Sequence, residues 1–174
     1  MQQNKYSKLP HISLLEYYQF VTFRTHDSVD DFIKRTRDED IPNNQKEYKI
    51  DNYLDNSFQG CYLNNEIIEY LRNFLINKNT DLYDLVAFCI MPNHIHILFK
   101  QKVELPNIMK SIKGSSSITI NKLLNKKGKF WDTGYYDKLI RDEKHFDVVY
   151  EYIKNNAIKA DLRDWEDRFY GIYE

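Results

Sequence analysis

The sequence has 174 residues, of which 42% are hydrophobic and 29% are charged, and its formal net charge is −1. This length predicts a single domain over residues 1–174, and the composition excludes wholesale disorder. No apolar run is long enough to cross a membrane, and the N-terminus lacks the pattern of a signal peptide. With only two cysteines far apart in the chain, we expect a cytoplasmic protein without a disulfide framework or a membrane partner.

The charges are unevenly distributed along the chain. Residues 100–131 contain eight lysines and one acid, whereas residues 27–66 contain ten acids and five bases. A basic segment of this kind can bind phosphates even on a nearly neutral protein, although it is equally typical of a solvated surface.

The N-terminal half predicts a strand, an insertion and a helix. Residues 17–25 are rich in aromatic and β-branched side chains, which favours a strand. Residues 27–63 are polar and acidic, and we expect an insertion with a short helix near 31–37 and an otherwise irregular chain. A helix over about 64–77 follows, because its apolar residues fall on one stripe.

Two apolar runs in the middle of the chain predict a β-hairpin. Residues 85–91 suit a central strand that is covered on both faces, and residues 94–99 resume strand character directly after Pro92-Asn93.

The rest of the chain is expected to be mainly helical. In chain order we expect a helix over 105–124 broken at Gly114, a loop or short strand over 128–136, a helix over 144–160 and an aromatic tail over 163–174 that packs back or frays. This order of elements favours an α+β fold, with helices packed on one face of an antiparallel sheet and the acidic insertion after the first strand.

His94 and His96 are candidate metal ligands. A spacing of two places both imidazoles on the same face of a strand. Two such rings on a rigid strand can bind one divalent cation. The plain alternative is a pair that faces solvent or packs on an aromatic ring. Their position within an otherwise apolar strand favours rings with polar partners, because burying them alone is costly.

The final helix separates two tyrosines by their angle around its axis. Tyr150 falls within the apolar stripe that includes Phe146, whereas Tyr152 lies on the flank. An available tyrosine can act as a nucleophile if a cation polarises its target. Asn156 lies on the same side, one turn later, and could supply a third metal ligand. The alternative is that Tyr152 merely borders the core.

Residues 87–98, which include Met91-Pro92-Asn93 before the two histidines, resemble the signature of the HUH single-strand transposases. They are similar to the REP-associated tyrosine transposases and the related single-tyrosine insertion-sequence enzymes. Later segments resemble the same family in the expected order, namely residues 111–114, 130–132, 136–142 and 151–160. The family usually has Asn-Pro after the tyrosine, where this chain has Asn156-Ala157.

The resemblance implies a ferredoxin-like or RRM-like sheet, with Mg²⁺ or Mn²⁺ held by His94 and His96. Tyr152 would attack single-stranded, hairpin-forming DNA, form a 5′-phosphotyrosine link and free a 3′-hydroxyl. A non-catalytic or domesticated single-strand-binding protein and a metal hydrolase that uses water stay open as alternatives. So does the choice between a monomer and a homodimer.

Four residues are candidate DNA contacts. Lys110, Lys113 and Arg141 are the best candidates for binding phosphates, and Trp131 offers either a stacking face for bases or an anchor for the core.

Overall fold

The computed structural model of the chain describes residues 13–173. Its centre is a five-stranded antiparallel sheet with the strand order β4-β1-β3-β2-β5. The strands are β1 (Tyr18–Arg24), β2 (Tyr83–Ile90), β3 (His94–Gln101), β4 (Tyr136–Leu139) and β5 (Phe169–Gly171). The α+β class and the β2–β3 hairpin are therefore confirmed.

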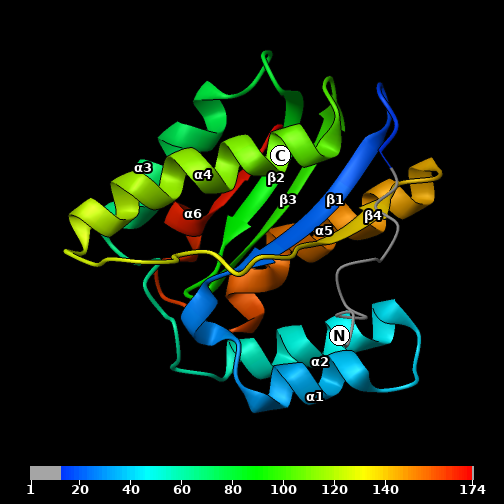
Figure 1. Cartoon of the computed structure of the whole chain (residues 1–174). Coiled ribbons are helices and arrows are strands. Elements are labelled where there is room, and N and C mark those ends of the chain that lie inside the picture. The colour runs from blue at the N-terminus through cyan, green and yellow to red at the C-terminus, as the bar shows by residue number, and fades with distance from the viewer. Residues whose placement is uncertain (1–12, 174) are drawn as a thin grey trace, which may run out of the picture.

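Helices cover both faces of this sheet (Figure 1). α3 (Glu66–Asn77) and α4 (Leu105–Leu123) share one apolar core with the sheet, and α5 (Glu143–Lys159) shares a second core with the opposite face. The expectation that the helices pack on one face is wrong, because α5 covers the other face. The remaining helical elements are η1 (His26–Ser28), α1 (Asp31–Asp38), α2 (Asn43–Asp55) and α6 (Trp165–Arg168).

The alternation of β3 decides which face carries the histidines. Ile95 and Ile97 belong to the core beneath α3 and α4, whereas Leu98 belongs to the core beneath α5. His94 and His96 share the face of Leu98, because side chains alternate along a strand. The predicted histidine pair therefore lies on the same side of the sheet as α5, the helix that carries Tyr152.

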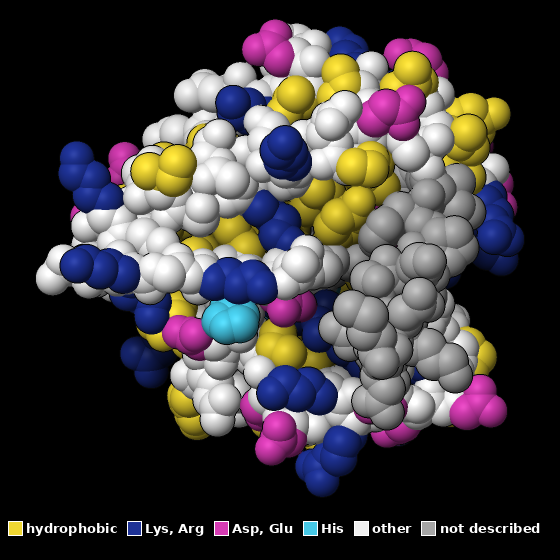
Figure 2. All heavy atoms as spheres, viewed as in Figure 1, with side chains coloured by type: hydrophobic (Ala, Val, Ile, Leu, Met, Phe, Trp, Pro, Cys, Tyr) yellow, Lys and Arg dark blue, Asp and Glu magenta, His cyan; other side chains and the backbone are white. Residues whose placement is uncertain are grey.

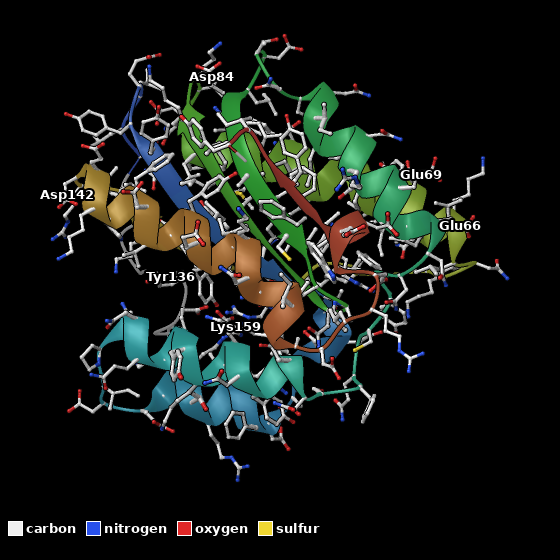
Figure 3. All side chains as sticks on the ribbon, turned by 180° about the vertical axis from the view of Figure 1, so that it is seen from behind. Glu66, Glu69, Asp84, Tyr136, Asp142 and Lys159 are labelled. Atoms are coloured by element: carbon white, nitrogen blue, oxygen red, sulfur yellow. The ribbon has the colours of Figure 1, made fainter. Side chains whose placement is uncertain are left out.

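The acidic segment after β1 forms a helical hairpin. The predicted short helix is confirmed as α1, but the expectation of an irregular chain after it is wrong, because α2 extends over thirteen residues. Ile50 and Leu54, one turn apart on α2, pack with Ile33 of α1 in a small core of their own. Seen from behind, the hairpin α1–α2 lies beside α5 (Figure 3).

The two ends of this hairpin meet beside the end of β1. The Thr25 hydroxyl donates a hydrogen bond to the carbonyl of Gly60 over 2.9 Å. Gly60 has a φ of +65°, and a Cβ atom there would lie 2.4 Å from Thr25 Oγ1. Only glycine fits this position without strain. The chain that follows α2 can therefore pass close to Thr25 at the end of β1.

The structure corrects one further prediction, the helix break at Gly114, and decides between the two alternatives for the C-terminal tail. α4 is continuous through Gly114, because the buried side chains of Ile112 and Ser116 hold both halves of the helix against the core. The aromatic tail packs back as α6 and β5, and β5 pairs with β2 along the edge of the sheet. Within residues 13–173, no helix has the length and apolar character needed to span a membrane.

Candidate metal and nucleophile site

His94 and His96 point their Nε2 atoms at each other across 3.1 Å. Both side chains are fully buried. Asn93 donates through Nδ2 to the carbonyl of Leu54, so its Oδ1 atom accepts from Nδ1 of His94 at 2.7 Å. The proton of His94 therefore sits on Nδ1, and the lone pair of Nε2 faces His96.

Thr22 of β1 orients the second ring. Its hydroxyl lies 2.7 Å from Nδ1 of His96, and Thr22 is paired with His96 in the register of β1 and β3. When the hydroxyl accepts the Nδ1 proton, the Nε2 atoms of both imidazoles present lone pairs to the same point. Such hydrogen bonds from neighbouring groups are the usual way in which metal-binding histidines are fixed.

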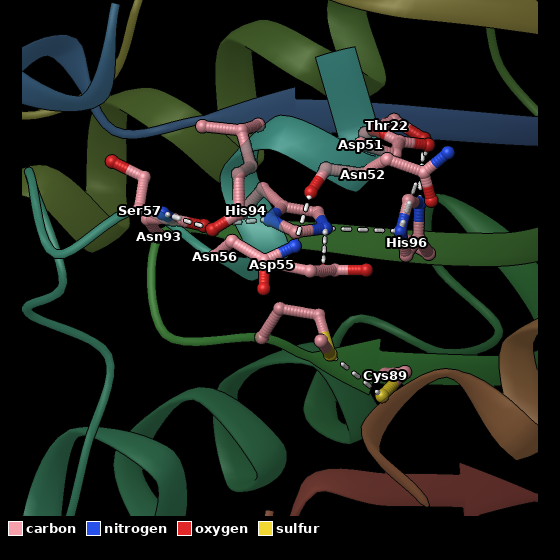
Figure 4. A network of polar contacts seen from close by, with 12 residues as sticks. Thr22, Asp51, Asn52, Asp55, Asn56, Ser57, Cys89, Asn93, His94 and His96 are labelled. Atoms are coloured by element: carbon pink, nitrogen blue, oxygen red, sulfur yellow. Dashed lines mark hydrogen bonds and ion pairs between the residues drawn. The ribbon is translucent and has the colours of Figure 1, made fainter. Parts of the chain in front are cut away.

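Carboxylates from α2 complete the cluster (Figure 4). Asp51 Oδ2 lies 4.0 Å from Nε2 of His96, and Asp55 Oδ1 lies 3.9 Å from Nε2 of His94. Among the described residues, Asp51, His94 and His96 form a buried group whose ligand atoms lie within 4.8 Å of one another. The surroundings of the imidazoles are therefore polar, although they are closed to solvent.

Tyr152 reaches this cluster from α5. Its hydroxyl donates to Asp51 Oδ2 over 2.8 Å, and its ring packs edge-on against His96 with centroids 5.2 Å apart. Tyr150, two residues earlier, instead donates to the carbonyl of Tyr173 and is buried in the second core. The helical angles thus predicted correctly that Tyr150 packs in the core and that Tyr152 lies on the flank of the helix, and the structure places this flank beside His96.

Burial dominates the electrostatics of the site. It lowers the pKa of His96 to about 3 and that of His94 well below its usual value, with a contribution from the nearby charge of Arg24. Both imidazoles are therefore neutral near pH 7, as metal ligation requires. Burial and the charge of Asp51 raise the pKa of the Tyr152 phenol far above 10.

The donor set fits a divalent cation on two counts. An octahedral ion binds each ligand atom at about 2.1 Å, so two neighbouring ligand atoms lie about 3.0 Å from each other. The Nε2 atoms of His94 and His96 are 3.1 Å apart, which is close to this value. In addition, one guanidinium, Arg24, faces two carboxylates, Glu47 and Asp51, and a third carboxylate, Asp55, interacts with Asp51. Burial and the charge of Asp51 raise the pKa of Asp55 to about 7, as expected for an excess of negative charge.

Asn156 lies in the same region but its predicted role as a ligand stays a prediction. It is buried on α5 one turn after Tyr152, and its Oδ1 atom has no hydrogen-bond partner among the described residues. A buried amide oxygen without a partner is unusual and fits a site that awaits a ligand.

Sequence comparison decides the family of the chain. Residues 50–156, more than half of its length, match the family described as "Transposase IS200 like". The chain belongs to the IS200-like transposase family. An uncharacterized protein of Haemophilus influenzae is 35% identical over 95 residues, which are 41% of this chain and 52% of that protein. The chain therefore spans about half the length of this curated relative.

A solved structure shares the fold of this family member. It shows a REP-associated tyrosine transposase bound to a REP hairpin, is 15% identical, and has a TM-score of 0.54. The match covers 90% of this chain and 75% of that one.

The helix α4 of this IS200-like transposase, which carries three lysines of the basic segment, lies away from the histidines. α4 packs on the opposite face of the sheet, and Lys and Arg side chains are scattered over that face among acidic ones (Figure 2). Lys113 donates to the carbonyls of Asp132, Thr133 and Gly134, so it already has three partners. Lys110 and Arg141 are exposed, and their DNA contacts stay predictions.

Trp131 is an anchor of the core. Its side chain is 3% exposed, and its indole N–H donates to Ser116 Oγ over 2.9 Å. The alternative role as a stacking face for bases is wrong for this arrangement, because no face of the ring is open.

Sequence reasoning missed the carboxylates of α2 and the role of Asn93. The signal was present, because Glu47, Asp51 and Asp55 are spaced four apart and therefore line one face of a helix. Ile50 and Leu54 have the same spacing, which marks an amphipathic helix over this segment.

Proposed function

We propose that this chain is a metal-dependent transposase that cuts and rejoins single-stranded DNA through Tyr152. The observation that carries the proposal is the meeting of the Tyr152 hydroxyl, both HUH imidazoles and a carboxylate at one buried point. Membership of the IS200-like family supports DNA transposition as the process. The solved relative with a bound REP hairpin supports hairpin-forming DNA as the substrate.

In the proposed reaction the phenolic oxygen of Tyr152 attacks a DNA phosphorus. A bond forms between this oxygen and phosphorus, and the bond from phosphorus to the 3′-oxygen breaks. The 5′-phosphate stays on the tyrosine, and the departing 3′-oxygen takes up a proton. The proton of the phenol passes to Asp51, which already accepts its hydrogen bond. A 3′-hydroxyl later attacks the phosphotyrosine, so no external energy source is needed.

His94, His96 and Asp51 would hold the cation, with Asn156 as a further oxygen ligand. The cation, Mg²⁺ or Mn²⁺, would neutralise charge on the scissile phosphate. The two nitrogen ligands favour Mn²⁺ over Mg²⁺, which prefers oxygen. A non-catalytic DNA-binding protein would not need this combination of neutral imidazoles, carboxylate and phenol.

The test is to trap the covalent intermediate. Labelled hairpin DNA with single-stranded flanks is incubated with the protein and Mn²⁺ and then run on a denaturing gel. We expect label on the protein band with the wild type and with Tyr150→Phe, and none with Tyr152→Phe or in EDTA. A labelled band that persists in Tyr152→Phe would falsify the assignment of the nucleophile.

A further inference from the structure

Arg24 is a buried cation at the edge of the site that the proposed reaction does not yet use. It is the last residue of β1 and is paired with His94 in the register of β1 and β3. Its side chain points to the same face as Thr22, two residues earlier, which contacts His96. Arg24 is 3% exposed.

The partners of Arg24 are acids of α2. Its Nη2 atom pairs with Glu47 Oε2 and lies 3.6 Å from Asp51 Oδ1. The other oxygen of Asp51 accepts the hydrogen bond of Tyr152. The guanidinium of Arg24 and the phenol of Tyr152 therefore face the same carboxylate from its two oxygens.

The guanidinium is only partly satisfied by these carboxylates. Its Nε atom is buried and has no hydrogen-bond partner among the described residues. Nε and Nη2 form the edge of the guanidinium that binds two oxygens of one phosphate in parallel. Here a carboxylate oxygen pairs with Nη2, and Nε has no hydrogen-bond partner among the described residues.

We propose that Arg24 binds the scissile phosphate, and that Glu47 takes the place of this phosphate when DNA is absent. The proposal rests on the proposed function, since it concerns the same substrate at the same site. Binding of DNA would exchange the Glu47 carboxylate for a phosphate, which fills both positions of the guanidinium edge. Arg24 then offsets the negative charge that builds up during attack by Tyr152.

Glu47 is well placed for this exchange. Its side chain is 16% exposed, more than that of Asp51 at 10% or Arg24 at 3%. It stands at the N-terminal end of the acidic stripe on α2, and its side chain would turn outward while Asp51 keeps its contact with Tyr152. The competing explanation is a structural ion pair that only fastens α2 to β1.

The first experiment measures DNA affinity without cleavage. Hairpin DNA with single-stranded flanks is titrated in EDTA against the wild type, Glu47→Gln and Glu39→Gln. Glu39 is the matched control, because it pairs with Lys49 on the same hairpin but away from the site. We expect Glu47→Gln to bind DNA about fivefold more tightly than the wild type, because a neutral amide competes less well than the Glu47 carboxylate for Arg24. Glu39→Gln should bind like the wild type.

The second experiment tests the guanidinium edge with Arg24→Lys. This change keeps the positive charge but removes the two parallel N–H donors. We expect covalent adduct formation in Mn²⁺ to fall by about 10²-fold, in line with the loss of a donor to developing charge. On DNA whose flanks carry uncharged methylphosphonates, the affinities of the wild type and Arg24→Lys in EDTA should become equal. A structural role would not depend on the charge of the DNA. Circular dichroism checks that the variant is folded.

The outcomes separate this proposal from the proposed function. If the wild type forms the adduct while Glu47→Gln binds no better than Glu39→Gln, the phosphate exchange is refuted and the nucleophile stands. The proposal would also be overturned if Arg24→Lys lost the same amount of DNA affinity on charged and on uncharged flanks. If the wild type forms no adduct, the proposed function itself fails, and the role of Arg24 in it fails as well.

Discussion

Asp51 contacts three functional groups through a single carboxylate, which makes it the most informative residue to change. It faces Tyr152 and His96 through Oδ2 and Arg24 through Oδ1. In Asp51→Asn we expect Mn²⁺ affinity to fall at least about tenfold, because a charged ligand is lost. Isothermal titration calorimetry measures this change, with the exposed Asp31→Asn as the control. Unchanged affinity would remove Asp51 from the metal site and leave Asn156 as the oxygen ligand.

The buried side chain of Lys113 makes the stability of the protein depend on pH. Burial lowers its pKa from 10.5 to about 8, so the unfolded chain binds a proton between these values that the folded chain does not. The contribution of Lys113 to stability must therefore rise as pH increases through this window. The free energy of unfolding of the wild type relative to Lys113→Met should rise from pH 8 to pH 10, as measured by urea denaturation. A difference that is constant across this range would contradict the assignment.

The control for this experiment is Lys110→Met on the same helix. Lys110 is exposed, so its loss should leave stability within about 0.5 kcal/mol of the wild type at every pH. At pH 7, Lys113→Met should cost about 1 kcal/mol or more, because three backbone carbonyls lose a common donor.

At the scale of elements, the hairpin α1–α2 is held to the rest of the molecule largely by polar contacts. Its buried apolar residues pack with one another. Its contacts with the rest of the molecule include Arg37–Asp132 at 2.9 Å, in the segment before β4, and Tyr152–Asp51, with α5. We expect backbone amides of α2 to exchange with solvent faster than those of β3, because polar contacts separate at lower cost than a large apolar core. Hydrogen exchange measured by mass spectrometry tests this, and equal protection of both elements would refute it.

The same division explains what the sequence could predict. Strands β2 and β3 were predictable, because each is a short apolar run bounded by turn residues. The shared face of the two histidines and the flank position of Tyr152 on its helix also followed from simple periodicity. α2 was missed because its polar and acidic composition hides an apolar stripe of only two residues, Ile50 and Leu54. The meeting of Asp51 with Tyr152 joins positions 101 apart in the sequence, and no local pattern carries that information.

At the scale of the whole molecule, Arg168 ties the C-terminal segment to the site-bearing sheet. Its guanidinium donates to the carbonyls of Leu63 and Ile90 and pairs with Asp164. Arg168→Met should destabilise the protein by about 3 kcal/mol or more, because two buried carbonyls lose their partner. Urea denaturation measures the loss, and the exposed Arg163→Met should change little. A small effect of both variants would show that the C-terminal segment is dispensable for folding.

The side-chain amide of Asn93 makes two hydrogen bonds, and these couple His94 to the end of α2. The side chain orients His94 and at the same time holds the carbonyl of Leu54 at the end of α2. A cation bound by a correctly oriented His94 must then strengthen the attachment of the hairpin, and the attached hairpin must strengthen cation binding by the same factor. Chelation should therefore speed proteolysis within α2, and cleavage of the hairpin should in turn release the ion.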